Sequence, residues 1–117
     1  MNLNDAIQKH AQWKYKFREA ISSKTTMDAT AISKDNNCEL GKWLHGEAKA
    51  LHGQRKAYAQ CLADHAAFHV EASKVASAVN SGKSDVVEHM LANGSPFFEV
   101  SRKVGVALVA LQNEIGH

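Results

Sequence analysis

Two histidines, His65 and His69, lie four residues apart within a long apolar stripe. This spacing brings both imidazoles to one face of a helix, about one turn apart. The stripe repeats with helical period over residues 54–79, and its other members are Tyr58, Cys61, Leu62, Phe68, Ala72, Val75, Ala76 and Val79. A buried imidazole loses its hydration, so the fold must supply hydrogen-bond or metal partners for its ring nitrogens.

Further stripes of helical period flank this one. A helix is predicted over residues 4–22, where the stripe consists of Leu3, Ala6, Ile7, His10, Trp13, Phe17, Ala20 and Ile21. A last helix is predicted to begin near Ser84 and to be interrupted at residues 93–96, where Pro96 lacks a backbone donor. Its final stripe continues as far as Ile115.

The region between the first two long helices is more irregular. Residues 23–37 contain polar, loop-like clusters and a short turn at 27–32. Cys38 follows, and a short helix is predicted from about Leu40 to Leu44, with Asp35, Asn36 or Asn37 as its cap. The sequence therefore predicts an all-α protein. We expect a four-helix bundle with a short extra helix after the Cys38 loop and a kinked or split last helix.

Composition narrows the function classes. The chain of 117 residues is long enough for one domain, spanning 1–117, and it has a net charge of +2. Its Lys and Arg residues are scattered among acidic ones, which argues against binding to nucleic acid or to an acidic membrane. No secretory signal is visible, and no apolar run approaches the ~20 residues that span a bilayer. Two cysteines make no disulfide framework, so we expect a cytoplasmic domain with reduced thiols.

Four side chains could form one metal site. His10 lies within the first apolar stripe, His65 and His69 lie within the second, and Cys38 lies just before the short helix. Three imidazoles and one thiolate complete a tetrahedral zinc set, and a helix N-terminus favours the thiolate. Each histidine alone is more simply explained as a core residue bonded to a carbonyl. Cys61 could also reach the site, although a small buried hydrophobe is the simpler interpretation.

The remaining histidines and the carboxylates suggest other sites less strongly. His45, His52 and His89 fall outside the stripes and are interpreted as solvated, and His117 is terminal. A hemerythrin-like di-iron bundle would need bridging carboxylates, but Asp64 and Glu71 only flank the histidine face. A structural or adaptor bundle without metal is the third alternative.

Three strings of residues resemble a known family. They are His10-Ala11-Gln12-Trp13-Lys14, Cys38-Glu39-Leu40-Gly41-Lys42-Trp43-Leu44 and His65-Ala66-Ala67-Phe68-His69. In this order and spacing they resemble the chemoreceptor zinc-binding domain, a bacterial sensory module, and the resemblance extends from about Leu3 to Ile115.

The resemblance implies a four-helix bundle, often homodimeric, with one zinc ion held by His10, Cys38, His65 and His69. Such domains are usually attached to a chemotaxis receptor or a diguanylate cyclase, and neither output sequence is present here. Four protein ligands would leave no open coordination position for water or substrate, so the expected function is regulatory rather than enzymatic. Zinc, or an oxidant such as hypochlorous acid acting on the zinc-bound thiolate, would be the signal.

Overall fold

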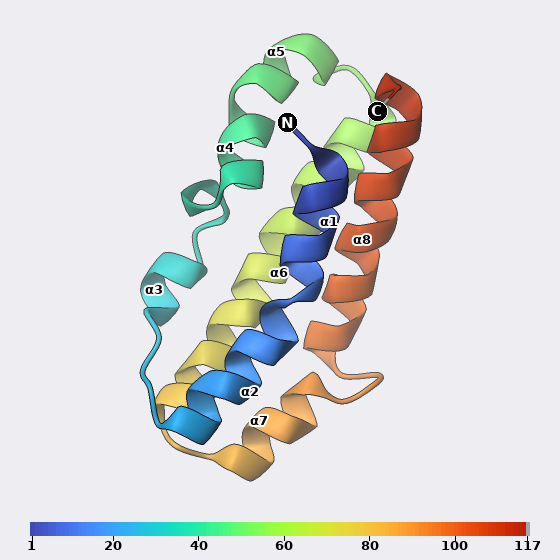
Figure 1. The fold of residues 1–117 in the computed structure, drawn as a ribbon. Coiled ribbons are helices and arrows are strands. Elements are labelled where there is room, and N and C mark those ends of the chain that lie inside the picture. Colours follow the sequence, from blue (N-terminus) through green and yellow to red (C-terminus); the bar gives the residue numbers. More distant parts are fainter. Residues whose placement is uncertain (117) are drawn as a thin grey trace.

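The computed structural model describes residues 1–116, and His117 lies outside the described residues. Three long rods run side by side along the molecule (Figure 1). The first rod consists of α1 (Leu3–Ala11) and α2 (Trp13–Ser23), which meet at Gln12, and the other two are α6 (Lys56–Asn80) and α8 (Pro96–Ile115). The sequence predicted one helix over residues 4–22, so the break at Gln12 is a difference in detail.

Short elements cover the remaining side of the bundle. They are α3 (Ala29–Ile32), the 3-10 turn η1 (Asp35–Asn37), α4 (Glu39–His45) and α5 (Glu47–His52). A further helix, α7 (Ser84–Leu91), connects the end of α6 to the start of α8 (Figure 1). Every regular element in residues 1–116 is helical, and the predicted all-α bundle is confirmed.

The predicted interruption of the last helix is also confirmed. Helix α7 ends at Leu91 and α8 begins at Pro96, which occupies the first turn, where its missing N–H costs nothing. The Ser95 hydroxyl accepts a hydrogen bond from the N–H of Phe98 at 3.1 Å and so caps α8. The start of α8 therefore has a local cause in Ser95 and Pro96.

The short helix after the Cys38 loop is present, but its cap differs from the prediction. Cys38 itself is the N-cap of α4, and its Sγ accepts a hydrogen bond from the N–H of Gly41 at 3.3 Å. The expected caps, Asp35, Asn36 and Asn37, form the 3-10 turn before it. The thiol that the sequence placed near the helix is therefore part of the helix start.

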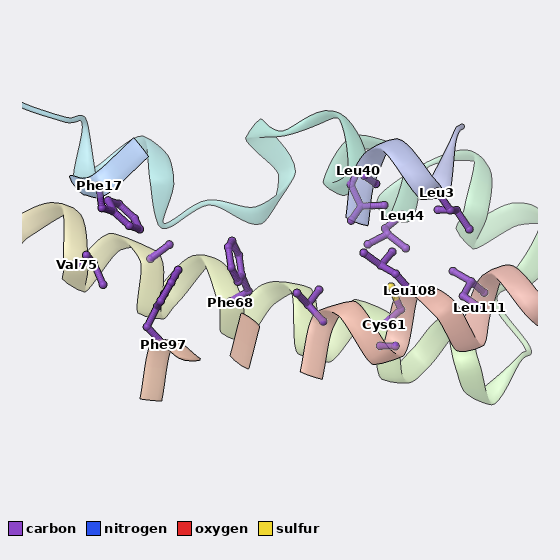
Figure 2. Close-up of a cluster of buried hydrophobic side chains, with 14 of the residues drawn as sticks. Leu3, Phe17, Leu40, Leu44, Cys61, Phe68, Val75, Phe97, Leu108 and Leu111 are labelled. Carbon is purple, nitrogen blue, oxygen red and sulfur yellow. The ribbon is translucent and has the colours of Figure 1, made fainter. Parts of the chain in front are cut away.

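The core extends along the whole bundle and changes character along its length. Figure 2 shows Phe17, Val75 and Phe97 towards one end and Leu3, Leu44, Leu108 and Leu111 towards the other. All of these side chains are buried. The first rod and α6 carry His10 and His65 between these two groups, so the histidines lie midway along an apolar core. In the described residues, none of the helices is long and apolar enough to cross a membrane.

Candidate metal centre

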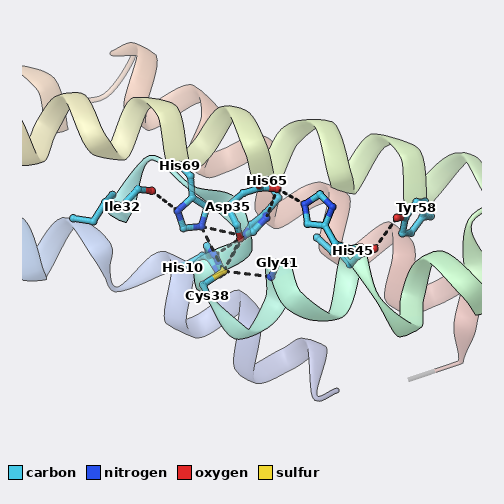
Figure 3. A network of polar contacts seen from close by, with 10 residues as sticks. His10, Ile32, Asp35, Cys38, Gly41, His45, Tyr58, His65 and His69 are labelled. Carbon is cyan, nitrogen blue, oxygen red and sulfur yellow. Dashed lines mark hydrogen bonds and ion pairs between the residues drawn. The ribbon is translucent and has the colours of Figure 1, made fainter. Parts of the chain in front are cut away.

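Four side chains from three parts of the chain converge inside the bundle (Figure 3). His10 comes from α1, Cys38 from the start of α4, and His65 and His69 from α6. One potential ligand atom from each lies within 4.8 Å of the other three, and residues 1–116 contain no other such group of histidines, cysteines or acids. The three imidazoles are at most 6% exposed, whereas Cys38 is partly exposed.

The spacing of these atoms fits a tetrahedral zinc ion. The Nε2 atom of His65 lies 3.2 Å from Nε2 of His10 and 3.1 Å from Nε2 of His69. The Sγ atom of Cys38 lies 3.3 Å from Nε2 of His65 and 3.5 Å from Nε2 of His69. Tetrahedral zinc bonds of about 2.0–2.1 Å to nitrogen and about 2.3 Å to sulfur imply N···N edges of about 3.3–3.4 Å and N···S edges of about 3.5–3.6 Å. These four edges are within a few tenths of an ångström of those lengths, and the other two, from His10 to Cys38 and to His69, are at most 4.8 Å.

Hydrogen bonds to backbone carbonyls fix the tautomers of two histidines. Nδ1 of His10 lies 2.8 Å from the carbonyl oxygen of Ala6, and Nδ1 of His69 lies 2.9 Å from that of Ile32. A carbonyl only accepts, so each Nδ1 must carry the proton. Both Nε2 atoms therefore present lone pairs to the centre of the cluster. These two unprotonated nitrogens are both acceptors and cannot hydrogen-bond to each other. A cation at the centre of the cluster could bind both of them.

Burial keeps the cluster uncharged when no cation is bound. It is the main cause that lowers the pKa of His65, and the nearby rings of His69 and His10 lower it further. Burial likewise lowers the pKa of His10 and of His69. The sequence predicted that the helix start would favour the Cys38 thiolate. The hydrogen bond from Gly41 acts in that direction, but burial has the larger effect and raises the pKa of Cys38.

Gly41 allows the Cys38 segment to fold closely against α4. A Cβ atom at this position would overlap the backbone carbonyl of Asp35 in the preceding turn. Sγ of Cys38 also lies 3.5 Å from that same carbonyl oxygen. The small residue three positions after the cysteine therefore determines where the turn, and with it the thiol, can lie.

Asp35 and His45 are part of this site, although the sequence suggested neither. Nε2 of His45 donates to Oδ2 of Asp35 at 2.8 Å, and the same oxygen lies 3.9 Å from Nδ1 of His65 (Figure 3). Asp35 was predicted only as a helix cap and His45 as a solvated residue. His45 is indeed exposed, yet its ring is bound to a carboxylate that faces the cluster.

Solvent can reach one side of the cluster. A cavity of about 530 Å³ is lined by residues of α2 and of the segment 25–37, and it extends to Cys38 and His69. Trp13, Met27 and Ile32 provide apolar parts of its wall. A metal ion or a small reagent could approach the thiol through this opening without unfolding the bundle.

The other residues considered from the sequence lie away from the centre. Cys61 is fully buried and belongs to the apolar core, and burial raises the pKa of its thiol to about 12. His52 is half-buried beside Trp43, with ring centroids 6.4 Å apart, and His89 is exposed. Cys61 therefore behaves as the small hydrophobe that the sequence favoured.

Comparisons with known proteins identify the family. The model of the chemoreceptor zinc-binding domain matches residues 10–76, which is more than half of the chain and includes all four converging residues. A search of the curated proteins found no match, and a search of the solved structures found none either. The family match and the His/Cys/His/His cluster agree on zinc as the expected metal. The chain belongs to the chemoreceptor zinc-binding domain family.

Proposed function

We propose that this chain is a zinc-binding regulatory module of bacterial signal transduction, in which His10, Cys38, His65 and His69 hold one zinc ion. The observation that supports this most strongly is the convergence of three Nε2 atoms and one Sγ at separations suited to a zinc tetrahedron. Four protein ligands leave no open coordination position for water or substrate. A closed site of this kind suits regulation rather than hydrolysis.

Zinc would connect three segments that are otherwise joined only by packing and hydrogen bonds. His10 belongs to the first rod, His65 to α6, and Cys38 to the irregular side of the bundle. Metal binding adds its free energy to folding and would hold that irregular side in place. Loss of zinc, or of the Cys38 bond alone, would release the segment around η1 and change the surface presented to a partner.

Oxidation of Cys38 offers a second input. With hypochlorous acid, the balanced step is RS⁻ + HOCl → RSOH + Cl⁻, in which sulfur is oxidised and chlorine is reduced. A sulfenic acid is a poorer zinc ligand than a thiolate, so the segment would be released. The cavity that reaches Cys38 gives a small oxidant access to the sulfur. We expect hypochlorous acid to release zinc from the wild-type protein in parallel with sulfenic acid formation at Cys38.

The proposed setting is the cytoplasm, where the domain would act as a homodimer on a chemoreceptor or a diguanylate cyclase, in cis or in trans. The family supports a place in chemoreceptor signalling. A dimer would let a change in one bundle alter the relative position of two attached output segments.

A hemerythrin-like di-iron centre is less well supported. Such a centre needs bridging carboxylates, and the converging group in residues 1–116 contains none. A metal-free bundle would have to satisfy the buried lone pairs of His10 and His69 with protons on Nε2 of His65 and on the Cys38 thiol. It predicts that a chelator leaves the thermal midpoint unchanged.

Elemental analysis tests the proposal directly. Protein purified without an affinity tag or added metal should contain about one zinc ion per chain. Cys38→Ala and His65→Ala should lose it, whereas the matched variants Cys61→Ala and His89→Ala should retain it. Absence of zinc from the wild type, with no uptake on titration, would exclude the proposed function.

A further inference from the structure

One ring nitrogen of the cluster lacks a hydrogen-bond partner. Nδ1 of His65 is fully buried and has none among the described residues. The corresponding atoms of His10 and His69 each donate to a backbone carbonyl. A buried N–H or lone pair without a partner costs free energy, so this exception calls for an explanation.

The polar group facing this nitrogen is a carboxylate. Oδ2 of Asp35 lies 3.9 Å from Nδ1 of His65, which is about 1 Å beyond a normal hydrogen bond. If Nδ1 carried only a lone pair, that lone pair would face a carboxylate oxygen across this gap. If Nδ1 carries the proton, the contact is attractive and Nε2 presents its lone pair to the centre, as in the other two histidines.

Asp35 is held at this place by the structure around it. His45 from α4 donates to the same carboxylate oxygen at 2.8 Å, and the backbone of Asp35 packs against Gly41. The carboxylate thus lies between a ring on α4 and a ring on α6. A displacement of the carboxylate by about 1 Å toward α6 would bring Oδ2 within hydrogen-bond distance of Nδ1 of His65.

We propose that Asp35 is a positioning residue for His65: its carboxylate accepts the Nδ1 proton, fixes the tautomer of the ring and orients Nε2 toward the metal. This inference rests on the proposed zinc site. Metal-bound histidines commonly donate their other nitrogen to such an oxygen. Because His10 and His69 use main-chain carbonyls, His65 is the ligand whose outer partner can be removed by a side-chain substitution.

Zinc affinity measured by competition with a chromophoric chelator tests this role. Asp35→Asn keeps the size of the side chain but removes its charge, and we expect zinc affinity to fall about 10–100-fold. Asp64→Asn is the matched control, since Asp64 precedes His65 on α6 but bonds to the amide of Gln60. Asp35→Asn binding zinc within twofold of the wild type would overturn the inference. A wild type that binds no zinc would instead overturn the proposed function.

Two spectroscopic measurements distinguish positioning from a general loss of structure. In zinc-loaded protein, the ring ¹⁵N resonances of His65 should shift in Asp35→Asn, while those of His10 and His69 should remain. With cobalt in place of zinc, the variant should retain the thiolate-to-metal absorption band of Cys38. Equal shifts at all three histidines, or loss of that band, would show that Asp35 acts by holding the loop and would overturn the inference.

Discussion

The three histidines and the cysteine come from two regions that are built differently. His10, His65 and His69 project from long helices into the apolar core, where the helices fix their positions by packing. Cys38 belongs to the segment 24–53, in which the longest helix, α4, has seven residues. Helices this short have little stability of their own and depend on tertiary contacts.

A few contacts connect this segment to the rest of the bundle. The hydroxyl of Tyr58 donates to the carbonyl of Leu44 at 2.6 Å, and His69 bonds to the carbonyl of Ile32. Leu40, Leu44 and Ala48 supply buried apolar side chains. From this comparison we expect the histidine side of the site to persist without metal and the position of Cys38 to depend more strongly on a bound metal ion.

The two cysteines give the largest expected contrast between the regions. In metal-free protein, iodoacetamide should modify the partly exposed Cys38 at least about 10³ times faster than Cys61, which becomes accessible only on global unfolding. Burial also raises the pKa of the Cys61 thiol to about 12, so its thiolate is scarce. Peptide mass spectrometry measures both rates. Comparable rates would mean that α6 opens as readily as the segment 24–53.

Zinc binding should protect the two regions unequally. At a free zinc concentration of about 100 times Kd, binding stabilises the folded protein by about 2.7 kcal/mol, and chelation removes this. Hydrogen exchange should therefore slow most in residues 29–45, and much less in α8, which supplies no candidate ligand. Uniform protection along the chain would show that the segment opens only together with the whole bundle. His89→Ala is the control: this exposed ring lies away from the cluster, so zinc should protect the variant in the same pattern as the wild type.

Gly41→Ala tests whether close packing of the η1 turn positions Cys38. The added methyl group overlaps the carbonyl of Asp35, so the turn must move, and we expect a loss of about 1–3 kcal/mol in the free energy of unfolding together with weaker zinc binding.

Gly105→Ala is the matched control for this substitution. Apart from the adjoining backbone of α8, a Cβ atom there has no neighbouring atom within 4 Å, so the change should stabilise α8 by about 0.5–1 kcal/mol. Urea denaturation measures both effects. If the two variants behaved alike, the contact between Gly41 and the Asp35 carbonyl would have no energetic importance.

The sequence predicted the long helices and the three buried histidines because two signals coincide there. In α1 and α6, the helical period and the burial of the stripe agree, so a histidine within the stripe must point into the core. The break before α8 was predictable from Pro96 and the residues around it. These features depend on local chemistry and on patterns that extend over several turns.

The arrangement around Cys38 could not be predicted in the same way. Asp35, Asn36 and Asn37 all favour helix caps, yet they form a 3-10 turn because Gly41 lets the Asp35 carbonyl approach α4. The pairing of Asp35 with His45 and its approach to His65 connect residues on three elements. No periodic pattern encodes such contacts, since they depend on how the turn packs.

The smallest expected effect concerns the other end of the segment. The amide side chain of Asn80 accepts from the N–H of Met27 and donates to the carbonyl of Met27, each at 2.7 Å. This pair of hydrogen bonds attaches the loop before α3 to the end of α6. Asn80→Ala should lower the free energy of unfolding by only about 1 kcal/mol. The loss is small because the two hydrogen bonds are exposed and because alanine is the better helix former. Thermal unfolding measures the loss.

The matched control is Ser81→Ala, since the Ser81 hydroxyl bonds only within its own helix, to the carbonyl of Ser77. Hydrogen exchange at residues 25–28 should quicken in Asn80→Ala and remain unchanged in Ser81→Ala. Zinc affinity should fall less in Asn80→Ala than in Gly41→Ala, because Asn80 anchors the segment far from Cys38 in sequence. An equal fall in the two variants would show that the segment moves as one unit, which would contradict the separate roles assigned to its two ends.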